Sequence, residues 1–96
     1  MTTIKNLFDI AVARFNRKAF TEAENLFLQI RNQIPDDIET LHYLAKIALV
    51  QGRYDTAAIS LGKVAAVKLD NADVLTELGR TYLGLGRLQD ALTCLK

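Results

Sequence analysis

Apolar residues recur along the chain at the spacing of an α-helix. One helical face is marked by Leu41, Leu44, Ala45, Ala48 and Leu49, and a second by Ala57, Ala58, Leu61, Val64 and Ala65. Gly52 lies between the two stretches, and glycine there is typical of a helix that stops in the left-handed conformation. The pattern therefore predicts a helix, a tight turn and a second, antiparallel helix.

The same pattern occurs three times with a constant spacing of 34 residues. Gly52 and Gly86, for example, occupy equivalent positions in successive copies. Six columns keep their size and polarity: Leu7, Leu41 and Leu75; Ile10, Leu44 and Leu78; Ala11, Ala45 and Gly79; Phe20, Tyr54 and Leu88; Ala23, Ala57 and Ala91; Phe27, Leu61 and Leu95. Six helices are predicted near 3–17, 20–33, 37–51, 54–68, 71–85 and 88–96. Asp36, with Glu39 three residues later, is expected to cap the third helix.

This repeat resembles the tetratricopeptide repeat (TPR) when its copies are numbered from Ile4, Ile38 and Ala72. The family expects a small residue at the eighth position, glycine at the fifteenth and alanine at the twentieth, and Lys18 is one of the departures in the first copy. The resemblance implies an all-α fold, a right-handed α-solenoid of three antiparallel helix-turn-helix repeats with about six helices. We expect one domain over 1–96, with repeats at 4–37, 38–71 and 72–96 and the third truncated.

In the TPR family the first helices of successive pairs line a concave groove that holds a peptide segment or a helix of a partner. Carried over by position, the groove residues are Phe8, Val12, Phe15, His42, Lys46, Val50 and Arg80. Phe8 and Phe15 have a competing interpretation as plain core residues. Gly84 either leaves room for a ligand backbone or marks a frayed helix end. Asp73 and Glu77 stand where family members that clamp a carboxylate have basic residues, so that clamp is absent.

The composition of the chain argues against several classes of function. The chain has 96 residues and a net charge of +1, which gives no electrostatic reason to expect a nucleic-acid or membrane partner. The only histidine, His42, and the only cysteine, Cys94, fall in different helix pairs, so we expect no zinc site and no catalytic dyad. We predict a protein that is not an enzyme, uses no cofactor, and is cytoplasmic, because a single cysteine fits a reducing compartment.

The last predicted helix is short, which leaves Ala91, Leu92 and Leu95 partly uncovered. Either the chain is a fragment of a longer array, which we favour, or two copies form a homodimer through the third repeat. The favoured function is a non-enzymatic module that binds a protein or peptide partner. The alternatives are a structural homodimerisation element and a regulatory repeat domain of a larger enzyme such as a transferase.

Overall fold

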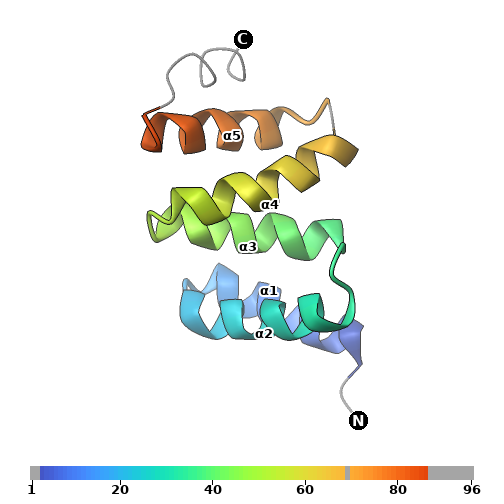
Figure 1. The fold of residues 1–96 in the computed structure, drawn as a ribbon. Coiled ribbons are helices and arrows are strands. Elements are labelled where there is room, and N and C mark those ends of the chain that lie inside the picture. The colour runs from blue at the N-terminus through green and yellow to red at the C-terminus, as the bar shows by residue number, and fades with distance from the viewer. Residues whose placement is uncertain (1–2, 69, 87–96) are drawn as a thin grey trace.

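Residues 3–68 and 70–86 are described by the structure, a computed structural model, and within them the chain forms five α-helices and no strand. The helices are α1 (Ile4–Asn16), α2 (Phe20–Gln33), α3 (Ile38–Val50), α4 (Tyr54–Val67) and α5 (Ala72–Gly84) (Figure 1). Each bound lies within one residue of its prediction. The sixth expected helix, at 88–96, and with it Ala91, Leu92 and Leu95, lies outside the described residues.

The first helix of each repeat begins with a side-chain cap at the same repeat position. The capping residues and their backbone N–H donors are Thr3 with Asn6, Asp37 with Thr40, and Asn71 with Val74, at 3.1, 3.1 and 3.0 Å. The expected cap at Asp36 is therefore wrong by one residue. Asp37 has the extended backbone that aims its carboxylate at the orphan N–H groups of the first turn.

The turns inside the repeats share one backbone conformation. Gly52 and Gly86 have φ angles of +74° and +76°, as predicted for left-handed helix stops. Lys18, at the equivalent position of the first repeat, has φ +63° although it carries a side chain. The turn geometry is thus kept in all three copies, and the lysine adopts it at a conformational cost.

The helices contact one another in chain order, each packing on the next in a stack (Figure 1). One core cluster joins α1, α2 and α3, and a second joins α3, α4 and α5. Helix α3 supplies both: Leu44 and Ile47 belong to the first cluster, and Leu41, Ala45 and Ala48 to the second. Helix α3 is therefore buried on two sides and links the two clusters.

Gly84 is explained by packing within the chain. A Cβ atom built on Gly84 would lie 2.5 Å from Cε1 of Tyr54, the first residue of α4. The missing side chain makes room for this ring, so the expectation of room for a ligand backbone is not met.

Candidate functional site

An aromatic cluster joins the first helices of the first two repeats, and Tyr43 of α3 is its centre. The Tyr43 ring stacks on Phe27 at 5.0 Å between centroids and lies in T-shaped contacts with Phe8 at 5.8 Å and Phe15 at 5.2 Å. Offset and edge-to-face pairs of this kind stabilise beyond the area they bury. Tyr43 therefore links α3 to both α1 and α2 through ring contacts.

The predicted groove residues of α1 take part in this cluster. Phe8, Val12 and Phe15 are half-buried and pack against the core between α1, α2 and α3. The core interpretation is thus supported in part, and the role of these three side chains in a groove stays a prediction. From α3, Lys46 places its Nζ 5.4 Å from the centroid of the Tyr43 ring, within the range of a cation–π interaction.

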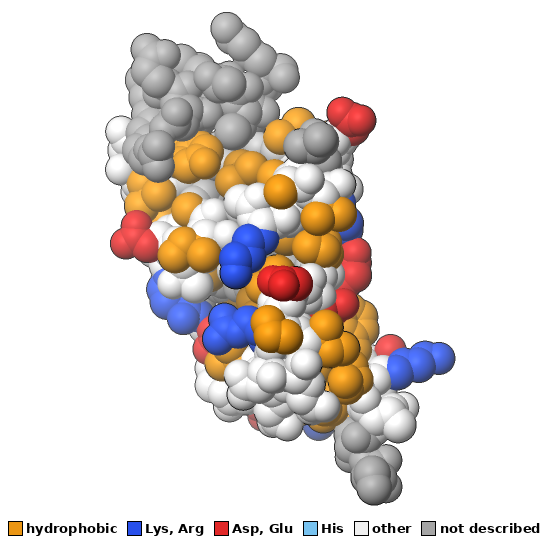
Figure 2. Space-filling view, turned by 45° about the vertical axis from the view of Figure 1, so that its right-hand side comes forward, with side chains coloured by type: hydrophobic (Ala, Val, Ile, Leu, Met, Phe, Trp, Pro, Cys, Tyr) orange, Lys and Arg blue, Asp and Glu red, His pale blue; other side chains and the backbone are white. Residues whose placement is uncertain are grey.

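A pocket of about 300 Å³ opens where the first turns of α1 and α3 meet α2. Its apolar lining comes from Ile4, Phe8 and Ile30, and its polar lining from Lys5, Asp37 and Glu39. Figure 2 brings forward the right-hand side of Figure 1, where α1 and α3 begin and α2 ends, and shows hydrophobic side chains interspersed with basic and acidic groups. An apolar recess with a few polar groups at its rim is the usual form of a ligand pocket.

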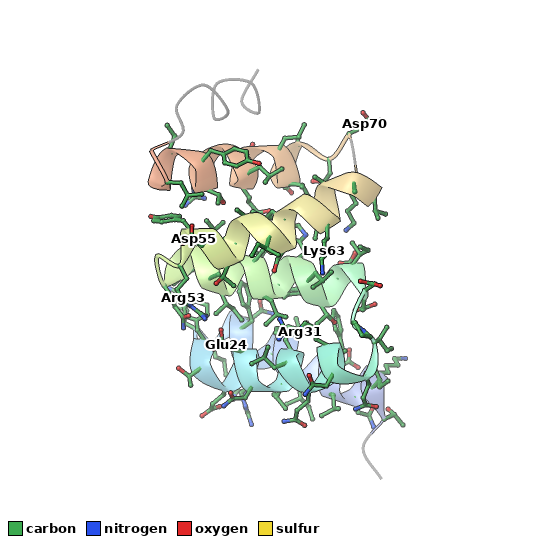
Figure 3. All side chains as sticks on the ribbon, viewed as in Figure 1. Glu24, Arg31, Arg53, Asp55, Lys63 and Asp70 are labelled. Atoms are coloured by element: carbon green, nitrogen blue, oxygen red, sulfur yellow. The ribbon has the colours of Figure 1, made fainter. Side chains whose placement is uncertain are left out.

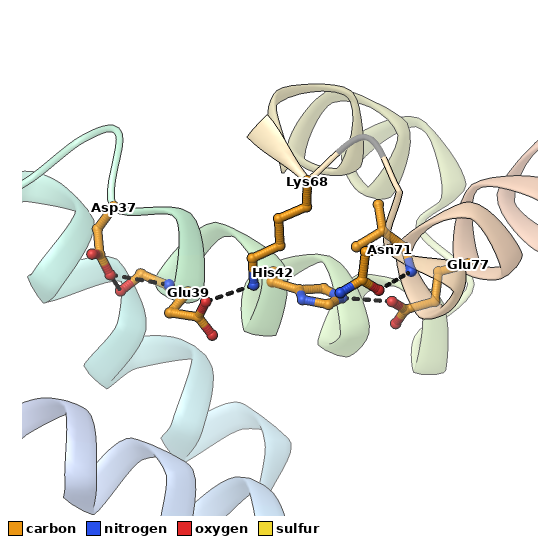
Figure 4. A network of polar contacts seen from close by, with 8 residues as sticks. Asp37, Glu39, His42, Lys68, Asn71 and Glu77 are labelled. Atoms are coloured by element: carbon orange, nitrogen blue, oxygen red, sulfur yellow. Dashed lines mark hydrogen bonds and ion pairs between the residues drawn. The ribbon is translucent and has the colours of Figure 1, made fainter. Parts of the chain in front are cut away.

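A row of polar contacts runs from this pocket toward α5 (Figure 4). Lys68 Nζ contacts Glu39 Oε1 at 2.6 Å, and His42 Nε2 lies 2.5 Å from Glu77 Oε1. His42 is only 8% exposed, so it is a buried link between α3 and α5 and not the open groove or surface residue expected. Glu77 is occupied by this contact.

The remaining predicted groove residues are exposed. Val50, at the end of α3, keeps 61% of its surface accessible, and Arg80 is exposed on α5. The structure thus gathers Phe8, Phe15 and Lys46 around Tyr43, and Val50 and Arg80 are exposed residues outside this cluster. Sequence reasoning missed the role of Tyr43, although an aromatic facing two phenylalanines across adjacent repeats was the available signal.

The described part of the chain contains neither a group of candidate metal ligands nor a helix that could span a membrane. Among residues 3–68 and 70–86 no three His, Cys, Asp or Glu side chains gather so that they could hold a metal ion. Within the same ranges, none of the helices has the length and apolar character needed to span a membrane. The features of this region are therefore an apolar pocket and the charged side chains at its rim.

Neither protein-family models nor curated proteins match the chain. The chain is, however, similar in fold to several solved structures. MamA 41-end from Desulfovibrio magneticus RS-1 superposes with a TM-score of 0.91 at 19% identity, over 97% of this chain and 52% of that one. MamA MSR-1 C2 gives 0.88 at 24% identity, over 96% and 53%. The type III secretion translocator chaperone SycD of Yersinia enterocolitica gives 0.84 at 18%, over 98% and 71%.

These likenesses, together with the helix pairs and their left-handed turns, define a TPR-like helical-repeat fold. At identities below 25% they show the fold alone. The chain spans about half the length of the MamA chains it matches.

Proposed function

We propose that the chain is a non-enzymatic protein-interaction module that binds a peptide segment or helix of a partner across α1, α3 and α5. In this proposal the three helices form the concave face of a right-handed solenoid. The observation that carries it is the pocket of about 300 Å³, which Phe8 joins to the half-buried aromatic cluster around Tyr43.

The pocket suits one aliphatic or aromatic side chain of a partner. Burying a leucine-sized side chain against Ile4, Phe8 and Ile30 would contribute about 1.5–3 kcal/mol. Several such anchors are needed for a stable complex, because association costs at least about 4 kcal/mol. Val50 offers a second exposed apolar contact along the same helices.

The charges at the rim favour an oriented ligand. Glu39 is paired with Lys68, whereas Lys5 takes part in none of the ion pairs of the described residues. An acidic group on the partner, next to its apolar anchor, would find Lys5 at the pocket edge. The interaction would contribute to specificity more than to affinity.

The test uses exposed residues, so that the fold is preserved. Peptides are selected from a displayed library on the wild-type protein, and their affinities are then measured by fluorescence anisotropy on Lys5→Glu and Val50→Asp variants. Val67→Asp is the matched control, because Val67 is the last residue of α4, as Val50 is of α3, and is similarly exposed. We expect the first two variants to weaken binding about tenfold and the control to leave it unchanged.

Other results of these binding measurements would refute the proposed groove. If selected peptides bind all three variants with wild-type affinity, or if only Val67→Asp weakens their binding, the binding face lies elsewhere. Circular dichroism of each variant checks that helix content and thermal midpoint are maintained.

A further inference from the structure

A second pocket, of about 390 Å³, lies between the second helices of the first two repeats. Arg31 and Asn32 come from the last turns of α2, and Ser60 and Lys63 come from α4. Figure 3 shows the two cations on their helices, Lys63 above Arg31. This pocket shares no lining residue with the one at α1 and α3.

Its two positive charges lack counterions within the described part of the chain. The ion pairs there use other basic residues, and both Arg31 and Lys63 are exposed. No carboxylate lines the pocket, and Asp36, which follows the lining residue Pro35, is ion-paired with neither cation. In a chain whose net charge is only +1, this is a local concentration of positive potential.

The rest of the lining is apolar or hydrogen-bonding. Leu41 is 3% exposed, and Ile59 on α4 is 68% exposed. The amide of Asn32 and the hydroxyl of Ser60 are neutral groups that donate hydrogen bonds to an oxygen anion. An apolar wall beside two unpaired cations matches a ligand in which carboxylates and aliphatic side chains are neighbours.

We propose that this pocket is a second docking site, which takes an acidic segment of a partner protein with glutamate or aspartate next to aliphatic residues. Arg31 and Lys63 receive the carboxylates, and the aliphatic side chain packs on Leu41 and Ile59. The site is separate from the groove under Proposed function and goes beyond it, because a chain with both sites would bridge two segments.

The probe is a short fluorescein-labelled peptide in which glutamate and leucine alternate, and its match carries lysine in place of glutamate. Binding is followed by anisotropy, and its location by amide shifts in ¹⁵N-labelled protein. We expect the glutamate peptide to bind, to shift the amides of Asn32 and Ser60, and to weaken as salt is raised. The lysine peptide should not bind.

The decisive variant is the charge reversal Arg31→Glu with Lys63→Glu, supported by the milder Lys63→Gln. The matched control, Arg17→Glu with Lys18→Glu, changes the net charge equally at exposed positions outside the pocket. Turning two attractive pairs into repulsive ones should weaken glutamate-peptide binding about tenfold and allow the lysine peptide to bind. The control should stay within about twofold of wild type.

Several results would overturn this site. One is equal loss in the control pair, which would mean a nonspecific charge effect. Another is weaker binding of the glutamate peptide to Lys5→Glu and Val50→Asp together with unchanged binding to the charge-reversal variant. That result would support the groove and refute this second site. A third is that inorganic phosphate alone causes the same amide shifts, which would mean a site for small anions. A fourth is that raising the protein concentration causes them, which would mean a contact between two copies of the chain.

Discussion

Two glycines of this chain allow the same substitution to be made in opposite backbone environments. Gly52 ends α3 with φ +74°, whereas Gly62 lies inside α4. A Cβ atom added at either position meets no atom within 4 Å. Changing each to alanine therefore tests backbone conformation alone, without any change in side-chain packing.

The two variants should change stability in opposite directions. At Gly62 alanine removes the helix-propensity penalty of glycine and should stabilise by about 1 kcal/mol. At Gly52 the left-handed conformation costs an alanine about 1–2 kcal/mol. Alanine also lowers the conformational entropy of the unfolded chain, which offsets about 0.4–1 kcal/mol of this cost. The net loss should therefore be about 0.8 kcal/mol, within a range of about 0–1.6 kcal/mol.

Thermal unfolding followed by circular dichroism measures both effects. For a domain of this size about 1 kcal/mol shifts the midpoint by about 4–8 °C, so Gly62→Ala should raise it and Gly52→Ala lower it by several degrees. Lys18→Gly, at the equivalent turn of the first repeat, should not lower it. A rise of the midpoint in Gly52→Ala would contradict the left-handed turn after α3, and a fall in Gly62→Ala would contradict an open position inside α4.

Four further substitutions test the cap of α3, the contact between His42 and Glu77, and the core, each by urea denaturation. Asp37→Ala should cost about 1 kcal/mol and Asp36→Ala less than about 0.5 kcal/mol, because Asp37 caps α3; equal losses would contradict the cap assignment. Glu77→Ala should cost about 1–3 kcal/mol by leaving buried His42 without its partner, and a wild-type midpoint would mean that the contact is not formed. Phe27→Ala should cost about 3–5 kcal/mol, since its ring is fully buried, and a loss below about 1 kcal/mol would place it outside the core.

The sequence carried enough local information to predict five helices within one residue of their ends. Helix ends depend on caps and left-handed turns, which are read from single residues such as Gly52. The cap of α3 was missed by one position because Asp36 and Asp37 are chemically identical neighbours. Only the backbone angles of the connecting loop decide which carboxylate faces the first turn.

The candidate site was less predictable than the fold. The repeat positions placed Phe8, Phe15 and His42 on the first helices of the repeats, and the structure shows them there, on α1 and α3. These positions carry no information on how far each side chain is buried. His42 is buried because Glu77 approaches it from the next repeat, a contact between residues 35 positions apart. The pocket between Arg31 and Lys63 likewise needs two second helices side by side.

The sequence by itself determined the helices, their turns and the repeat of 34 residues, because these follow from apolar spacing and from the conformations single residues prefer. The tertiary structure alone decided which carboxylate caps α3, which ring fills the space at Gly84 and which cations stay unpaired. Those outcomes depend on distances between helices. Such distances are set by the packing of whole side chains and cannot be read from any one stretch of chain.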